Sequence, residues 1–176
     1  CMALKTFGCK LTGLSSVYLG NNTALESLDC TLSRIDSLDL SNNPELKILH
    51  TSSLITSLDL SNNTKLNVLY CNNSKLTSLD LSHNPELKEL NCAYNDITSL
   101  DLSNNTALTK LDCYNNKLTS LDLSKNTALT KLHCSNNQLT SLDVSGCTAL
   151  TAFKGNDQTL DIGDVSGSYD LRGLPE

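Results

Sequence analysis

The stretch LTKLDCYNNKLTSLDLSKNTA, residues 108–128, consists of two similar halves of 10 and 11 residues. Each half has an apolar-x-apolar triplet followed by a run of Asn, Ser, Thr and Lys. Side chains of a strand alternate between two faces, so each triplet predicts a short strand with two side chains inward and one outward. The polar run predicts a turn, because Asn and Ser side chains can satisfy turn backbone groups. One unit therefore predicts one coil of the chain.

This unit recurs along most of the sequence. Leu-Asp-Leu triplets begin, after a first step of 20 residues, every 21 residues at Leu38, Leu58, Leu79, Leu100 and Leu121, with Leu-Asp-Val at Leu142. Triplets of the type Leu-x-Cys lie between them. A fixed period places each strand beside its predecessor, parallel and about 4.8 Å away. The pattern predicts a β-rich solenoid over residues 1–155, with about seven coils, two parallel sheets and little or no helix.

The half-unit at residues 108–118 resembles the leucine-rich-repeat consensus LxxLxLxxNxL, with Cys113 in the third apolar position. The nested arrangement of two such halves is similar to the bacterial class called IRREKO, and more loosely to the internalins. The resemblance implies a right-handed superhelix, horseshoe-shaped or nearly straight, that binds a partner with its variable strand face. The sequence departs from the pattern at Thr12, Ser33 and Ser74, which replace Asn, and residues 49–58 are one residue short. We expect local irregularity there.

Charge and hydropathy exclude two classes of partner. The net charge of −6 and the pI near 4.9 argue against nucleic acid, which requires clustered Lys and Arg. No apolar run approaches the roughly 18–20 residues that span a bilayer, and no signal peptide is recognisable. The chain starts inside a repeat, which predicts a fragment without an N-terminal cap and leaves end-to-end self-association open. Residues 156–176 are interpreted as a last strand at 160–162 and a cap remnant or linker.

Six of the eight cysteines occupy one inward position of successive coils, with Thr51 and Gly155 in the same position elsewhere: Cys9, Cys30, Cys71, Cys92, Cys113 and Cys134. Buried free cysteine behaves as a small apolar residue, so we expect a buried column of thiols. Disulfides between neighbours remain an alternative, since one strand spacing is within their Cα range. A zinc site is disfavoured because side chains in one column do not converge tetrahedrally. Cys1 is either a lipidated first residue or, as its alignment with Cys147 favours, part of a repeat.

Two further columns are interpreted as structural. The outward aspartates of the Leu-Asp-Leu triplets predict a solvated ladder supported by Ser hydroxyls, with calcium bridging as the alternative: Asp39, Asp59, Asp80, Asp101, Asp122 and Asp143. The asparagines that end the half-units are expected to stack and to bond turn backbones. His50 and His133 are four coils apart, so they cannot form one dyad, and no nucleophile, base and orienting group occur together. We therefore expect neither catalysis nor a cofactor.

The Leu-x-Cys strands carry the variable outward positions, whereas the Leu-Asp-Leu positions are monotonous. Three of the five tyrosines lie on or next to these strands, and Tyr is favoured at binding surfaces. The predicted partner-binding residues are Tyr70, Asn91, Tyr94, Asp112, Tyr114 and His133. We expect a non-catalytic scaffold of a secreted or surface bacterial protein that binds a protein or glycan. The alternatives are unselected drift of these positions, a structural spacer, or an ice-binding-like flat face suggested by the threonine column at Thr56, Thr77, Thr98, Thr119 and Thr140.

Overall fold

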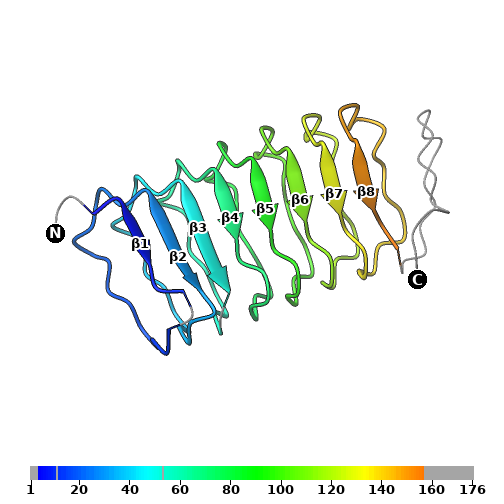
Figure 1. The fold of residues 1–176 in the computed structure, drawn as a ribbon. Coiled ribbons are helices and arrows are strands. Elements are labelled where there is room, and N and C mark those ends of the chain that lie inside the picture. Colours follow the sequence, from blue (N-terminus) through cyan, green and yellow to red (C-terminus); the bar gives the residue numbers. More distant parts are fainter. Residues whose placement is uncertain (1–3, 11, 53, 157–176) are drawn as a thin grey trace.

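A computed structural model describes residues 4–10, 12–52 and 54–156. Eight short strands form one parallel sheet in chain order, side by side in a single row (Figure 1). They are β1 (Thr6–Gly8), β2 (Ser27–Thr31), β3 (Ile48–Ser52), β4 (Val68–Tyr70), β5 (Glu89–Asn91), β6 (Lys110–Asp112), β7 (Lys131–His133) and β8 (Ala152–Lys154). The part of the chain described contains no helix. The predicted β-solenoid is confirmed.

The strands pair so that equivalent residues of successive coils are neighbours. From β2 to β7 the central residue of each strand is a leucine that lies beside the next, as Leu69 does beside Leu90 and Leu90 beside Leu111. These leucines point inward and are almost fully buried. Because each coil presents the same apolar positions, the core is a set of stacked rows in which each side chain contacts its equivalents in the coils before and after.

The second predicted sheet is wrong. The Leu-Asp-Leu triplets bury their leucines, but the described residues form only the one eight-stranded sheet. The backbone groups that a second ladder would need are occupied locally. The Asp80 carboxylate accepts the N–H of Ser82 at 2.9 Å, and the Leu81 carbonyl accepts bonds from the Asn84 N–H and from Asn105 Nδ2, both at 3.1 Å. The triplets therefore lead into consecutive turns instead of pairing as strands.

The short half-unit at residues 49–58 does not disturb the sheet. Strand β3 stays in register with β2 over five residue pairs and with β4 over three pairs, and Leu49 lies between Leu28 and Leu69. After the strand, Ile55 lies in the core with no exposure. The irregularity expected from the sequence is therefore absent from the strand face.

Two columns of asparagine join the coils, as expected. In one, Asn84 Nδ2 donates to the carbonyls of Asn63 at 2.9 Å and Leu60 at 3.2 Å in the preceding coil. In the other, Asn95 Nδ2 donates to the carbonyl of Cys71 at 3.0 Å, while its Oδ1 accepts the N–H of Leu76 at 3.0 Å. Each side chain thus satisfies backbone groups of the previous coil that no strand partner reaches.

The cysteine column is buried, as predicted. Its six members are at most 4% exposed, and within the described residues none of them forms a disulfide. Burial raises the pKa of Cys30 to about 11 and that of Cys71 to about 12. Thr51 is buried at the same position of the intervening coil. Cys147 occupies a different position, where earlier coils carry the first asparagine column. Cys1, the expected strand at 160–162 and the interpretation of residues 157–176 lie outside the described residues.

Candidate binding surface

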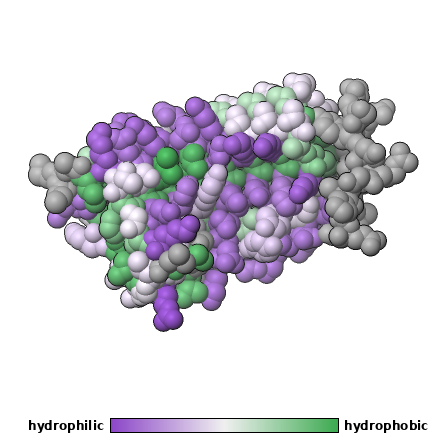
Figure 2. Space-filling model, in the orientation of Figure 1, coloured by the Kyte–Doolittle hydropathy of each residue, from purple (hydrophilic) through white to green (hydrophobic). Residues whose placement is uncertain are grey.

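The outer face of the sheet carries two rows of side chains, one on each side of the buried leucines. The first row consists of Thr6, Ser27, Ile48, Val68, Glu89, Lys110, Lys131 and Ala152. The second row consists of Gly8, Asp29, His50, Tyr70, Asn91, Asp112, His133 and Lys154. Four predicted site residues, Tyr70, Asn91, Asp112 and His133, are consecutive in the second row and in register. In Figure 2, hydrophilic residues cover much of the middle of the face drawn there, with hydrophobic ones among them.

These four residues line a shallow hollow of about 330 Å³ over β4–β8. The first row adds Glu89, Lys110, Lys131 and Ala152 to its lining, and Lys154 of the second row closes it on β8. The residues between Tyr70 and His133 in the second row are the shorter Asn91 and Asp112, so the two rings bound the hollow. Tyr94 and Tyr114 do not line it. They lie beside it, beyond the carboxyl ends of β5 and β6.

Tyr70 is fixed on both sides. Its ring stacks on that of His50, with centroids 4.6 Å apart and planes 8° from parallel. Its hydroxyl donates to Glu89 Oε2 at 2.8 Å, and Glu89 Oε1 pairs with Lys110 Nζ at 2.6 Å. Partial burial and the bond to Glu89 raise the pKa of Tyr70, while Lys110 lowers the pKa of Glu89. Tyr70 is thus a rigid aromatic wall that loses little conformational entropy on binding.

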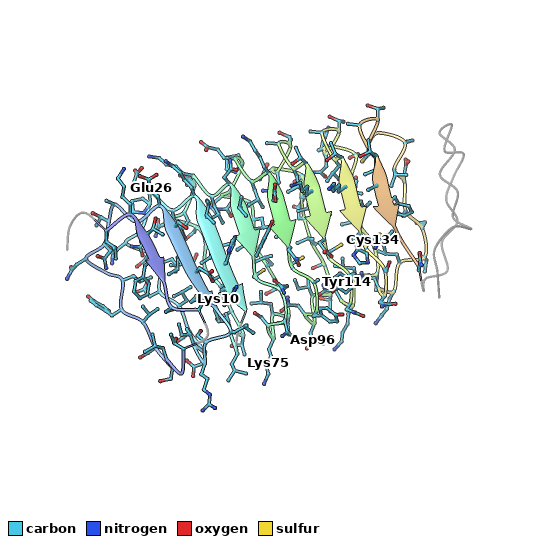
Figure 3. All side chains as sticks on the ribbon, viewed as in Figure 1. Lys10, Glu26, Lys75, Asp96, Tyr114 and Cys134 are labelled. Atoms are coloured by element: carbon cyan, nitrogen blue, oxygen red, sulfur yellow. The ribbon has the colours of Figure 1, made fainter. Side chains whose placement is uncertain are left out.

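A second aromatic group lies at the other end of the hollow. The His133 ring stacks on Tyr114 at 4.3 Å and 9°, and Tyr94 meets Tyr114 edge-on at 4.6 Å. Figure 3 labels Tyr114 on the carboxyl-terminal side of the strands, opposite the edge that carries Glu26. His133 Nδ1 is 3.5 Å from Asp112 Oδ1. Burial raises the pKa of Asp112 and lowers that of His133, so desolvation outweighs their attraction and favours a neutral imidazole.

Tyr94 occupies a strained backbone position. Its φ is 53°, and the equivalent residues Leu32, Asn73, Asn115 and Asn136 have φ between 52° and 57°. Asn tolerates this left-handed conformation, whereas a bulky residue pays roughly 1 kcal/mol or more for it. Tyr94 is nevertheless 49% exposed. Leu32 shares the strain and is 55% exposed, but only Tyr94 of the two packs on Tyr114 beside the hollow, which makes Tyr94 the candidate for function.

The sequence analysis missed the first row. It counted one outward residue per triplet, but the residue before each leucine also points outward, since the alternation extends one step earlier. That step would have identified Glu89, Lys110 and Lys131. The surface consequently carries more charged side chains than the predicted site residues, of which only Asp112 is formally charged.

The opposite side of the coil is uniform. In the six coils that carry an outward aspartate, its carboxylate accepts the backbone N–H of the serine two residues later, at 2.8–3.0 Å. These bonds lower the pKa of all six aspartates. The backbone N–H of each of these serines therefore supports the aspartate ladder, in addition to the serine hydroxyl expected from the sequence. Across residues 4–10, 12–52 and 54–156, no three His, Cys, Asp or Glu side chains are arranged to hold a metal ion. Nor does that part of the chain include a helix able to cross a membrane.

Comparison with known proteins agrees with this geometry. The family described as Leucine Rich repeats (2 copies) matches residues 85–126, and Leucine Rich Repeat matches residues 128–150. The chain belongs to the leucine-rich-repeat family and is similar to the internalins. A search of curated proteins finds no match.

Among solved structures, the functional domain of InlJ from Listeria monocytogenes, described as including a cysteine ladder, is similar at 36% identity with a TM-score of 0.87. The match covers 92% of this chain and 36% of that one. The internalin InlF from the same organism is 25% identical, with a TM-score of 0.76 over 81% of this chain and 45% of that one. YopM from Yersinia enterocolitica is 25% identical, with a TM-score of 0.70 over 81% and 31%. The chain thus spans less than half the length of these relatives.

Proposed function

We propose that this chain is a non-catalytic binding scaffold of a secreted or surface bacterial protein, and that it recognises a partner protein through the outer face of its sheet. The observation that carries the proposal is the hollow over β4–β8, in which four variable residues of successive coils lie in one row. The similarity to internalins supports the bacterial setting and the scaffold role.

The difference between the two faces favours the sheet face as the binding surface. The Asp face repeats the same Asp–Ser bond in six successive coils, as a structural ladder does. The sheet face instead carries His50, Tyr70, Tyr94 and Tyr114, held by stacking and hydrogen bonds, beside paired and unpaired charges. Binding hot spots are enriched in such aromatic residues, surrounded by polar groups that exclude water.

A protein partner suits the hollow better than a sugar. Its lining includes Glu89, Lys110, Asp112, Lys131 and Lys154, five formally charged residues within one shallow surface. Charged side chains of both signs give electrostatic complementarity to a protein surface, and they fix its register. A neutral glycan would leave the exposed Lys131 and Lys154 without a charged partner.

The test is affinity capture from the surface and secreted fractions of the source organism, followed by measurement of Kd with the purified partner. Tyr70→Ala, Tyr94→Ala and Tyr114→Ala should each weaken binding by about 2 kcal/mol, close to 30-fold. The matched controls Asp80→Ala, Asp101→Ala and Asp122→Ala should leave Kd nearly unchanged. Loss of binding in the aspartate variants, with full binding in the tyrosine variants, would place the site on the other face.

A further inference from the structure

The outer face of the sheet changes character along the solenoid. Near β3 and β4 the first row carries Ile48, which is 37% exposed, and Val68, beside the stacked rings of His50 and Tyr70. Near β7 and β8 the two rows carry Lys131 and Lys154. One end of the face is therefore apolar and aromatic, and the other is cationic.

The chain offsets this cationic end only in part: Lys131 lowers the pKa of Glu89 and Lys154 acts against the raised pKa of Asp112, but only at a distance. Lys110 is paired with Glu89 at 2.6 Å, and Asp112 faces His133 at 3.5 Å. Along the edges of the coils, other lysines pair with carboxylates one coil away, as Lys47 does with Glu26 and Lys117 with Asp96. Within the described ranges, Lys131 and Lys154 form no such pair, although both are exposed on a chain whose net charge is −6.

The two lysines are placed to share one anion. Lys131 lies beside Ala152, whose small side chain leaves space on β8, and Lys154 lies beside His133. They are on neighbouring strands and two residues out of step, so their Cα atoms are about 8 Å apart. Long, flexible side chains at that separation can converge on a carboxylate held between them.

We propose that the outer face of the sheet, from β3 through the hollow to β8, takes an extended segment of a partner protein that crosses the strands, with an acidic side chain between Lys131 and Lys154. An apolar or aromatic side chain of the same segment packs on Ile48, Val68 and Tyr70. This inference rests on the proposed function and specifies its partner. From β3–β4 to β7–β8 is four strand spacings, about 19 Å, which an extended chain covers in about six residues. The segment therefore carries its acidic and apolar residues about six positions apart.

The probe is a phage-displayed library of random linear peptides, selected against the whole chain. We expect enrichment of peptides with Asp or Glu about six positions from an apolar or aromatic residue. For a selected peptide, Lys131→Gln combined with Lys154→Gln should weaken binding roughly three- to tenfold, as two exposed ion pairs imply. Ile48→Ser should also weaken it. The control Lys117→Gln, at the coil edge, should leave binding unchanged.

The outcomes separate this inference from the proposed function. One outcome is that the selected peptides require Tyr70 but show no preference for acidic residues, or do not depend on Lys131 and Lys154. That result would retain the sheet face as the binding surface and overturn the inference. Peptides that bind independently of every sheet-face substitution, or a selection that yields no binder, overturn both. Equal binding of a selected peptide and its Glu→Gln counterpart likewise overturns the acidic assignment.

Discussion

The asparagine column allows a specific prediction, because Asn84 makes its side-chain hydrogen bonds to the preceding coil through one atom, Nδ2. Its side chain is fully buried, and Nδ2 donates to the carbonyls of Leu60 at 3.2 Å and Asn63 at 2.9 Å. Among the described residues, no group donates a hydrogen bond to its Oδ1. Asn84→Asp keeps the shape but replaces the donor with an oxygen that faces two carbonyl oxygens. The two bonds are worth about 1 kcal/mol each, and a buried carboxylate without donors adds several more. We expect a loss of about 3–5 kcal/mol at pH 7.

The pH dependence of this variant has a definite sign. Burial and the facing carbonyls raise the pKa of the introduced carboxyl above its unfolded value of about 3.9. The protonated form can donate one hydrogen bond, so the variant is closest to wild type below about pH 4. Its deficit grows as the pH rises through the raised folded pKa.

The assay is urea unfolding of variant and wild type, followed by circular dichroism and compared at equal pH from 4 to 7. Asn104→Asp is the matched control, because Asn104 is exposed and makes only a 3.4 Å contact to Ser82 O. It should change stability by less than about 0.5 kcal/mol. An Asn84→Asp protein as stable as wild type at pH 7 would refute the reasoning about the column.

Three other predictions concern the cysteine column, the strained position and the Asp face. The column thiols should resist labelling in the folded chain and react after denaturation, because burial raises their pKa; denatured, unreduced protein that still lacks reactive thiols would indicate disulfides. Cys113→Asp should cost several kcal/mol in urea unfolding, against a smaller loss for Cys113→Ser. Asn115→Tyr should destabilise the fold by about 1 kcal/mol, whereas Tyr94→Asn should weaken partner binding with little change in stability, since relief of strain offsets the lost ring contact. The pKa values of the six outward aspartates are lowered in the folded chain, so their ionised carboxylates should contribute to stability. This contribution is full above about pH 4 and is lost as the pH falls through the folded-state pKa values. A thermal midpoint unchanged from pH 5 to pH 2 would contradict this.

Much of the fold could be predicted from the repeat, because equivalent residues take the same place in successive coils. The inward leucines, the cysteine column and both asparagine columns could be assigned from position alone, since a fixed period fixes each slot. The second sheet could not be excluded. Whether Asp80 bonds the N–H of Ser82 or leaves it for a strand partner depends on turn geometry that Leu-Asp-Leu does not specify.

The candidate site was only partly predictable. The register of Tyr70, Asn91, Asp112 and His133 follows from the period, and the structure places them in one row. The stacking of Tyr114 on His133 depends on side-chain directions beyond the strand ends, where alternation gives no guidance. Tyr94 is informative because three other coils carry Asn at the same position, but its positive φ could be seen only in the structure.

The most direct test of the central claim is hydrogen–deuterium exchange of the chain with and without a captured partner. The sheet-face account predicts new protection on the strands and the residues after them, at 68–73, 89–94, 110–115 and 131–136. It predicts no change on the aspartate triplets at 79–82, 100–103 and 121–124. Protection confined to the aspartate triplets, with the strand segments unchanged, would contradict it.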